Sequence, residues 1–474
     1  MQSTTRLFDA NSRKALADAP LQQALGKLSS NFTVKRSLAA GRLPEFEALR
    51  DQSRDIKDHV LAHLDIYLER FEAKVVAQGG IVHWCRDADE VRTTVLAICR
   101  AAGARTATKS KSMITEEIAL NDHLEANGIE PIETDLGEYI IQLRHEHPSH
   151  LIAPAIHLNK NQVEATFRAA HTDLPPGRNL EEPRSLLEEA RAKLRRRFLE
   201  ADVGITGANM LIAETGSIVT VTNEGNADLT MTLPRVHIAI ASIEKIVPTL
   251  EDATTLLRVL ARSATGQENS VYTTFATGPR RPDDADGPRA FHVVLLDAGR
   301  SALIGGSFQD MLRCIRCGAC LNHCPVYGAI GGHAYGWVYS GPIGSVLTPG
   351  LIGIAEAAKL PNASTLCGRC EEVCPVRIPL PRLLRQWREK EFEQGLQTTT
   401  ARVGIGVWAF LARRPALYRQ VTGAVVRILG WLGRRHGSFY NLPLASSWTA
   451  DRELPAPEGR TFIDQWRARG GSKK

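Results

Sequence analysis

Cysteine spacing constrains this chain more than any other feature of its sequence. Seven of the nine cysteines lie between residues 314 and 374, and the first four follow the pattern C-x2-C-x2-C-x3-C-P. This is the bacterial ferredoxin run, in which three thiolates hold one [4Fe–4S] cluster and the fourth thiolate reaches a different cluster. The run therefore predicts an iron–sulfur centre, and its members are Cys314, Cys317, Cys320 and Cys324.

A second cysteine group repeats only the end of that run. It reads C-x2-C-x3-C-P from Cys367 to Pro375, and Ser364 stands where the lead cysteine would be. If the two groups exchange ligands as two-cluster ferredoxins do, the second cluster is one thiolate short. The predicted ligands are Cys314, Cys317, Cys320 and Cys374 for cluster one, and Cys324, Cys367 and Cys370 for cluster two.

These ligand sets predict a [4Fe–4S] first cluster and either a [4Fe–4S] or a [3Fe–4S] second cluster. The fourth ligand of the second cluster stays open among water, Ser364, His333 and a partner protein. Zinc is the competing metal, but seven cysteines with two Cys-Pro endings fit two four-coordinate zinc ions poorly. Disulfides are disfavoured because closely spaced thiols in a reducing cytosol more often hold metal.

The region before the cysteines alternates short apolar runs with helical stretches, which is typical of βαβ units around a mainly parallel sheet. A turn at residues 214–217 predicts a hairpin, and residues 277–289 predict a loop. The expected strands are 81–84, 128–132, 209–213, 218–222, 236–241, 271–276 and 291–296. The expected helices are 88–102, 114–127, 180–199 and 251–263.

The predicted fold class is therefore multidomain, α/β followed by α-helical. We expect a helical segment over 1–60, an α/β domain over 61–300, a ferredoxin-type two-cluster domain over 301–392 and a basic helical region over 393–474.

Composition limits the partners and the compartment. The 474 residues carry 58 Lys and Arg against 52 Asp and Glu, a formal charge of +6 that gives no case for nucleic acid. The N-terminus lacks a basic segment followed by an apolar one, and no run of 18 residues is free of charge and apolar. We therefore expect a cytoplasmic protein, with the inner membrane face as its only membrane contact.

At these residues the sequence resembles a known family, the lactate utilisation protein B family. Its ferredoxin-type domain is similar to RCIRCGACLNHCPVYGAIGGHAYGWVYSGPIGSVLTPGL and LCGRCEEVCPVRIPL. Its α/β domain is similar to ITGANMLIAETGSIVTVTNEGN and FHVVLLDAGRS, and its closing segment to WTADRELPAPEGRTFIDQW. The resemblance implies two [4Fe–4S] clusters with an incomplete second cysteine set. It also implies an iron–sulfur electron-transfer role in a three-protein system that oxidises L-lactate to pyruvate.

No acid–base or nucleophile pair is identifiable in the sequence, so we assign no catalytic residue. The lactate chemistry is then expected in partner subunits of a lactate-oxidising complex, with electrons passing singly toward a membrane acceptor such as quinone. Three alternatives remain open: an iron–sulfur subunit of another flavin-linked dehydrogenase (for glycolate or glycerol 3-phosphate), a catalytic α/β domain for a phosphate or acyl substrate, and a redox-sensing scaffold.

Charged residues near the motifs have two interpretations each. Arg313, Arg316 and Arg369 either favour the reduced clusters or form a solvated basic rim. Glu214, Lys109 and Lys111 either line a cleft at strand ends or are a tight turn with solvated lysines, and the second interpretation is preferred.

Other candidate motifs are given no chemistry. His145, His147 and His150 match no zinc spacing and are expected at the surface or between domains. Cys85 and Cys99 are expected to be buried as small apolar side chains. Gly404-x-Gly406-x-x-Ala409 lacks a preceding strand, so it is a chance match to a dinucleotide motif.

The C-terminal region is strongly basic. Residues 395–450 contain seven arginines and neither lysine nor acid. Interleaved apolar residues predict either a surface for an acidic partner or anionic lipid, or a helical pair packed on the protein's own core.

Overall fold

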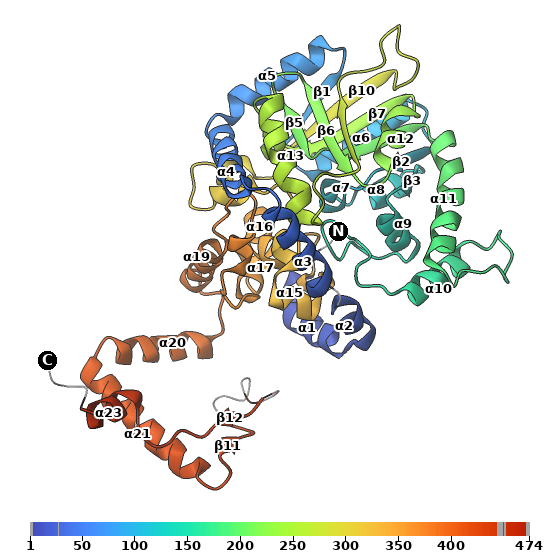
Figure 1. Ribbon diagram of the computed structural model, residues 1–474. Coiled ribbons are helices and arrows are strands. Elements are labelled where there is room, and N and C mark those ends of the chain that lie inside the picture. Colours follow the sequence, from blue (N-terminus) through green and yellow to red (C-terminus); the bar gives the residue numbers. More distant parts are fainter. Residues whose placement is uncertain (1–2, 27, 443–448, 450–451, 471–474) are drawn as a thin grey trace. The chain divides into compact units, whose positions relative to one another are not determined.

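The computed structural model describes residues 3–26, 28–442, 449 and 452–470 (Figure 1). The chain divides into two compact units, Met1–Glu391 and Phe392–Lys474. We describe each unit by itself.

A six-stranded parallel sheet forms the centre of the α/β part. Its strand order is β1-β10-β7-β4-β2-β3, and every neighbouring pair is parallel. The strands are β1 (Ile81–Cys85), β2 (Thr106–Lys109), β3 (Glu130–Glu133), β4 (Val203–Gly207), β7 (Val236–Ser242) and β10 (Ala290–Leu296). The predicted parallel sheet is confirmed. The sequence analysis missed β2 and β4, which are short and come directly after helices.

Helices connect these strands, as βαβ units require. They are α6 (Ala88–Ala101), α7 (Met113–Glu117), α8 (Leu120–Ala126), α9 (Leu136–Leu143), α10 (Lys160–Ala170), α11 (Pro183–Glu200), α12 (Asn226–Thr232) and α13 (Leu250–Ala264). The single helix predicted over 114–127 is wrong. Ala119 has φ +50°, a left-handed conformation that an α-helix does not tolerate, so the segment divides into α7 and α8.

The predicted hairpin belongs to a second, smaller sheet. Its order is β8-β5-β6-β9, from β5 (Met210–Ile212), β6 (Ser217–Thr222), β8 (Ile246–Val247) and β9 (Tyr272–Ala276). The turn between β5 and β6 needs glycine at 216, where φ is +73° and a Cβ would lie 2.7 Å from the backbone of Lys74.

Five N-terminal helices join the α/β part to the cysteine-rich part. They are α1 (Phe8–Ala17), α2 (Ala19–Leu25), α3 (Leu28–Gly41), α4 (Phe46–Ala62) and α5 (Leu64–Ala77). Helix α4 contacts both α13 and the 3₁₀ turn η4 (Gln309–Arg313), and α5 contacts β1. Figure 1 shows these helices, in blue, running along the first unit from the sheet to the helices that follow residue 310.

The cysteine-rich part is helical, as predicted. It contains α14 (Ala319–Asn322), α15 (Pro325–Ile330), α16 (Gly341–Ile352), α17 (Ile354–Ala357), α18 (Arg369–Glu372) and α19 (Leu380–Glu393). Short 3₁₀ turns complete the unit: η1 (Thr5–Leu7), η2 (Ile243–Lys245), η3 (Ser301–Leu303), η5 (His333–Tyr335) and η6 (Leu360–Asn362). One continuous apolar core includes side chains from α4, α13 and α16 together with Cys317, Cys320, Cys370 and Cys374.

The second unit holds three helices and a small hairpin among the residues that the structure describes. These are α20 (Thr399–Ala412), α21 (Pro415–Gly433), β11 (Ser438–Phe439), β12 (Leu454–Pro455) and α23 (Phe462–Ala468). Of the closing segment quoted above, residues 448, 450 and 451 lie outside the described residues. Among the helices that the structure describes, none is long and apolar enough to span a bilayer.

Candidate iron–sulfur site

The two cysteine loops repeat one backbone conformation. Arg316 has φ +60° and Gly318 has φ +72°, and 50 residues later Leu366 has φ +56° and Gly368 has φ +85°. Both glycines precede a short helix, α14 and α18 respectively. A non-glycine residue held with positive φ is costly, and such strain is common at functional sites. The same strained turn, used twice, wraps each cysteine run.

The repeat extends to the position where the second run lacks a cysteine. In the first loop the Sγ of Cys314 accepts a hydrogen bond from the backbone N–H of Arg316 at 3.4 Å. In the second loop the Oγ of Ser364 accepts from the backbone N–H of Leu366 at 3.1 Å. Ser364 therefore stands in the place, and makes the backbone contact, of the lead cysteine.

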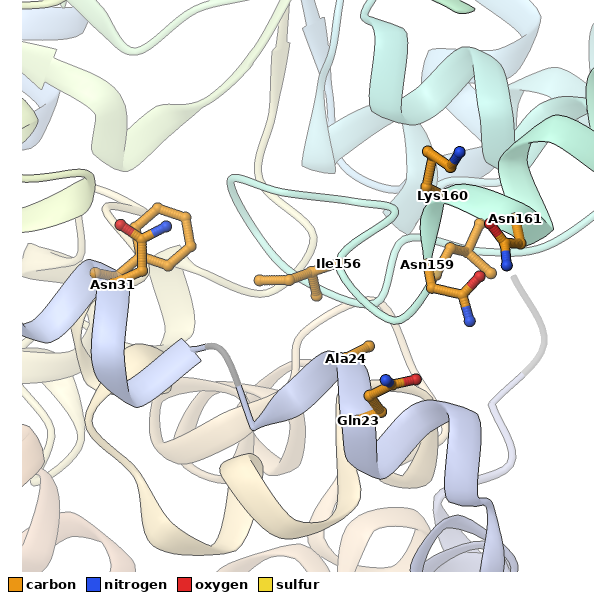
Figure 2. A pocket seen from close by; sticks show the side chains of 9 residues that line it. Gln23, Ala24, Asn31, Ile156, Asn159, Lys160 and Asn161 are labelled. Atoms are coloured by element: carbon orange, nitrogen blue, oxygen red, sulfur yellow. The ribbon is translucent and has the colours of Figure 1, made fainter. Parts of the chain in front are cut away.

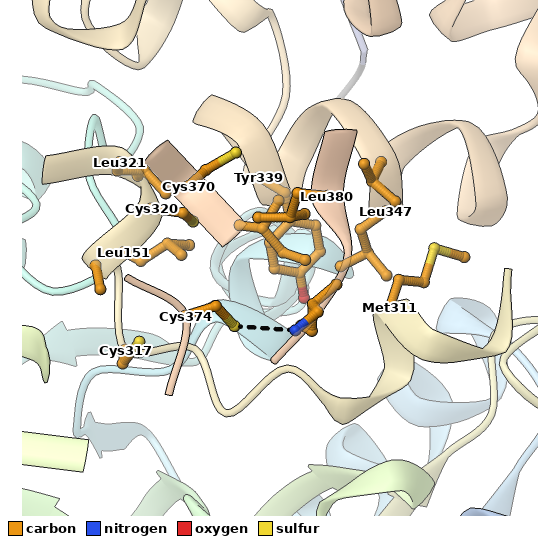
Figure 3. Close-up of a cluster of buried hydrophobic side chains, with 14 of the residues drawn as sticks. Leu151, Met311, Cys317, Cys320, Leu321, Tyr339, Leu347, Cys370, Cys374 and Leu380 are labelled. Atoms are coloured by element: carbon orange, nitrogen blue, oxygen red, sulfur yellow. Dashed lines mark hydrogen bonds between the residues drawn. The ribbon is translucent and has the colours of Figure 1, made fainter. Parts of the chain in front are cut away.

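The first predicted ligand set is brought together. Burial raises the pKa of Cys317, and the neighbouring thiols of Cys374 and Cys314 raise it further. Burial likewise raises the pKa of Cys374 to about 11, with Cys314 again contributing. Figure 3 shows Cys317, Cys320 and Cys374 at one edge of the apolar core. Such thiols stay protonated unless a metal ion takes the place of the proton.

The second predicted set is also brought together. Burial raises the pKa of Cys370 to about 12, and Cys324 and Cys367 add to the shift. Cys367 is exposed, and its pKa is lowered because the backbone N–H of Arg369 donates to its sulfur. One face of this second site is therefore open to solvent, whereas Cys317, Cys320 and Cys374 of the first set are buried.

Backbone N–H groups point at several sulfurs. The N–H of Tyr327 donates to Cys324 Sγ at 3.5 Å, and the N–H of Ile378 donates to Cys374 Sγ at 3.4 Å, the dashed line in Figure 3. Each donor lies just after a Cys-Pro pair, where the proline turns the chain. Hydrogen bonds to sulfur stabilise negative charge and raise the reduction potential of a bound cluster.

Two buried arginines that the sequence analysis missed hold the second Cys-Pro turn. Arg50 on α4 donates to the carbonyl of Cys374 through Nε at 3.1 Å and Nη2 at 2.8 Å. Arg36 on α3 donates to the carbonyl of Val373 at 2.9 Å. Nothing local in the N-terminal helices signals this role, since the partners lie more than 300 residues away.

Arg316 is part of a buried ionic network, so its interpretation as a solvated rim is wrong. Its side chain is 8% exposed and pairs with Glu244 at 3.3 Å, while its guanidinium lies 4.6 Å from the centre of the Tyr339 ring. Burial acts to raise the pKa of Glu244, but Arg300 and Arg316 outweigh it and lower the pKa to about 2.

Arg300 carries the network into the α/β part. It is fully buried and pairs with Glu244 at 3.2 Å and with Glu117 at 2.7 Å. The hydroxyl of Tyr339 donates at 2.6 Å to Glu117 Oε2, the oxygen that also accepts from Arg300. The cysteine loop and the sheet are thus joined by charge-assisted hydrogen bonds inside the protein.

The other two arginines of the motifs behave differently from each other. Arg313 is largely buried and pairs with Asp58 and with Asp310, which fixes the start of the first run to α4. Arg369 is half-exposed and pairs with Glu372. The solvated interpretation therefore holds for Arg369 alone.

The weaker sequence candidates are resolved as follows. Lys109 is not solvated: it is fully buried and bonds Glu133 at 2.6 Å, because its strand β2 lies between β4 and β3. Glu214 caps α13 by accepting from the N–H of Leu250. His150 lies between the α/β part and the cysteine run, 3.0 Å from Asn322.

The two remaining cysteines are buried, as expected. Burial raises the pKa of Cys99 to about 12, which leaves it an inert thiol.

Comparison with known proteins agrees with this geometry. Residues 68–296 match the family model described as LUD domain, and residues 310–378 match the 4Fe-4S dicluster domain. Lactate utilization protein B of Shouchella clausii (strain KSM-K16) is 43% identical over 98% of this chain and 97% of its own length. The chain belongs to the lactate utilisation protein B family.

Other relatives share this full-length match. Lactate utilization protein B of Lysinibacillus sphaericus (strain C3-41) is 41% identical, over 98% of this chain and 97% of its own length. The Uncharacterized electron transport protein YkgF of Escherichia coli (strain K12) is 40% identical, over 96% of this chain and 95% of its own length. A solved DUF162 family protein from Deinococcus radiodurans shows only a weak likeness, with a TM-score of 0.26 and 16% identity over 49% of this chain and 98% of its own.

The donor set fits iron–sulfur clusters. Seven thiols in two adjacent groups, most of them buried and with backbone N–H donors on their sulfurs, form the environment that such clusters require. The 4Fe-4S dicluster match covers all seven cysteines.

Proposed function

We propose that this protein passes single electrons between a partner oxidoreductase, which oxidises L-lactate to pyruvate, and a downstream acceptor. The gathering of seven thiols in two neighbouring groups supports this function most directly. Clusters bound there would supply sites that accept and release one electron at a time. The names of the relatives, Lactate utilization protein B and electron transport protein, agree with it.

In this proposal Cys314, Cys317, Cys320 and Cys374 hold the first cluster and Cys324, Cys367 and Cys370 the second. The first would be [4Fe–4S] and the second [4Fe–4S] or [3Fe–4S]. Ser364 takes the fourth position of the second cluster, because its Oγ repeats the backbone contact of Cys314. His333 is less suited, since its Nε2 is engaged by the carbonyl of His147 at 2.7 Å.

Ser364→Cys tests this ligand assignment. Completing the four-thiolate set should slow the loss of iron to a chelator, and it should change the electron paramagnetic resonance signal of one cluster only. Ser364→Ala should lose iron faster than the unaltered protein. If both variants keep the unaltered signal and the unaltered rate of iron loss, Ser364 is not at the cluster.

The electron-transfer role is tested on anaerobically purified full-length protein. Iron and sulfide counts should match two clusters, and dithionite should reduce them reversibly. The protein should reduce an acceptor when the lactate-oxidising partner and L-lactate are present, and it should not oxidise lactate alone. Rapid lactate oxidation by the isolated chain would overturn the carrier assignment. Turnover with glycolate or glycerol 3-phosphate partners instead would move the protein to another flavin-linked dehydrogenase.

The second unit is the proposed docking surface for an acidic partner subunit. The seven arginines of residues 395–450 form no ion pair with a carboxylate within the described part of the chain, so most of their charge is available. Arg427 is near enough to Asp464 to help lower the pKa of that carboxyl. Large apolar side chains lie exposed beside them, among them Trp408 at 63% and Trp431 at 73%. Exposed apolar groups with uncompensated positive charge favour a partner of opposite charge.

Salt dependence tests this surface. Binding of the purified partner should weaken as ionic strength rises, and it should weaken further in a variant with Arg434→Gln and Arg435→Gln. Equal affinity of that variant for the partner would refute the docking site. Sedimentation with vesicles containing anionic lipid, unchanged by the partner, would instead place the chain directly at the inner membrane face, beside a quinone-linked acceptor.

A further inference from the structure

A polar cavity lies at the carboxyl ends of three neighbouring strands of the parallel sheet. It encloses about 300 Å³ and is lined by residues that follow β2, β4 and β7, such as Ser110, Asn209 and Lys245. Parallel α/β sheets bind their ligands at this edge. Arg316 and Tyr339 close the cavity on the side of the cysteine loops, so it borders the first cysteine run.

Three polar groups on the cavity wall lack partners among the described residues, and two of them are fully buried atoms. Lys245 is 9% exposed and makes no hydrogen bond or ion pair with any residue in the described part of the chain. Nη1 of Arg316 and Oγ of Ser110 are buried in the same wall without a hydrogen-bond partner among the described residues. A buried donor left unpaired costs about 1–3 kcal/mol, and more when it is charged. Such groups are explained when a ligand completes them.

The charge around this wall favours an anion. Its lining carries three cations, Lys111, Lys245 and Arg316, and two carboxyls, Asp135 and Glu224. Burial, and then Asp135, raise the pKa of Glu224 to about 7, so positive charge exceeds negative charge along the wall. Burial and then the neighbouring Arg316 lower the pKa of Lys245 to about 8, which shows that these two cations lie close enough to repel each other. An anion between Lys245 and Arg316 would remove that repulsion.

The number of free donors limits the anion. One ammonium group and one guanidinium nitrogen suit the two oxygens of a carboxylate, whereas a phosphate dianion usually collects more donors. Oγ of Ser110 can accept or donate to a hydroxyl or oxo group beside the carboxylate. Apolar side chains on the remaining wall, including Ile152, Val221 and Leu260, suit a short carbon chain.

We propose that this cavity binds a short-chain hydroxy or oxo monocarboxylate through Lys245, Arg316 and Ser110. The choice of L-lactate and pyruvate as first probes rests on the proposed function, but the anion site itself does not. Nothing is proposed for the second cavity of Figure 2, about 440 Å³ between α2, α3 and the start of α10. Its only charged lining residue, Lys160, already donates to the carbonyl of Glu181.

Calorimetric titration of the anaerobic full-length protein tests the proposal. L-lactate or pyruvate should bind saturably, and the uncharged ester methyl L-lactate should not. Lys245→Met should weaken binding at least about ten-fold and Ser110→Ala about three-fold, in line with a charged and a neutral hydrogen bond. The matched control Lys160→Met, in the other cavity, should bind as the unaltered protein does.

Three results would overturn the proposal. The first is that neither acid binds saturably. The second is that Lys245→Met and Ser110→Ala both bind the acids as tightly as the unaltered protein does. The third is that the protein binds inorganic phosphate in preference to both acids. Iron and sulfide counts on every variant distinguish failure of the cavity proposal from failure of the proposed function. A protein that binds the acids but carries no clusters would refute the electron-transfer role and leave the cavity assignment intact.

Discussion

Replacing Arg300 by methionine should destabilise the first unit strongly. The guanidinium is fully buried, and it neutralises Glu117 at 2.7 Å and Glu244 at 3.2 Å. Methionine fills much of the same space without charge. Two carboxylates would then remain buried with one cation fewer, and removing one partner of a buried ion pair costs about 3–5 kcal/mol.

The size of the first unit converts this cost into a temperature. A unit spanning Met1–Glu391 has an unfolding entropy of about 0.8 kcal/mol/K if each residue contributes about 2.1 cal/mol/K. A loss of 3–5 kcal/mol should therefore lower the melting temperature by about 4–6 °C. Because the network joins Arg316 to the sheet, cluster content should fall as well.

Differential scanning calorimetry under anaerobic conditions measures the shift. The control is Arg385→Met, which removes a surface ion pair to Glu389 at 3.7 Å from a side chain that is 68% exposed. Surface pairs contribute about 0–1 kcal/mol, so the control should shift the melting temperature by at most about 1 °C. Equal shifts in the two variants would show that the buried network contributes no more to the free energy of unfolding than a surface ion pair, and would refute the argument.

Three further predictions concern other buried groups. Burial lowers the pKa of His237 to about 3, so the folded protein loses stability as pH falls below 6.5 while the unfolded chain takes up a proton. His237→Gln should therefore recover about 2 kcal/mol of the stability lost between pH 6.5 and pH 5. If the variant and the unaltered protein lose the same unfolding free energy between these two pH values, the prediction is wrong. Burial, and then Glu133, raise the pKa of Glu138 well above its ordinary value, so stability falls as pH rises through the range above 4.5. Glu138→Gln should be more stable than the unaltered protein at pH 8 and closer to it in stability at pH 5. A gain in stability at pH 5 alone would contradict the predicted direction of the pH dependence. A Cβ at Gly332 would lie 1.7 Å from the carbonyl oxygen of Ser149, so Gly332→Ala should cost about 1–3 kcal/mol by thermal unfolding. Gly328→Ala, with nothing within 4 Å, is its control, and a larger loss there would disprove the steric account.

Local sequence determined the features that depend on short spacing. The cysteine runs, the hairpin at residues 214–217 and the buried strands β7 and β10 were all predicted from neighbouring residues. Strands β2 and β4 were missed because four or five residues beside a helix carry too weak a pattern. The break at Ala119 was also missed, since an alanine with positive φ has no sequence signal.

The candidate site shows the same division. Its thiols were found from their spacing, whereas Arg36 and Arg50, which hold the second Cys-Pro turn, come from helices more than 300 residues away. The sequence showed that Ser364 replaces the lead cysteine of the second run. Only the structure showed that its Oγ accepts a hydrogen bond from the backbone N–H of Leu366.

The sequence by itself predicted the kind of chemistry, because three of the predicted ligands of the first cluster, Cys314, Cys317 and Cys320, follow one another within a few residues. Tertiary structure alone decided which charges are buried together. Ser110 and Lys245 line one cavity because β2 and β7 bring their carboxyl ends to one edge of the parallel sheet, and Arg316 reaches the same cavity from the cysteine loop. Burial then makes their unpaired donors costly, and that cost is a property of the folded environment that no local pattern records.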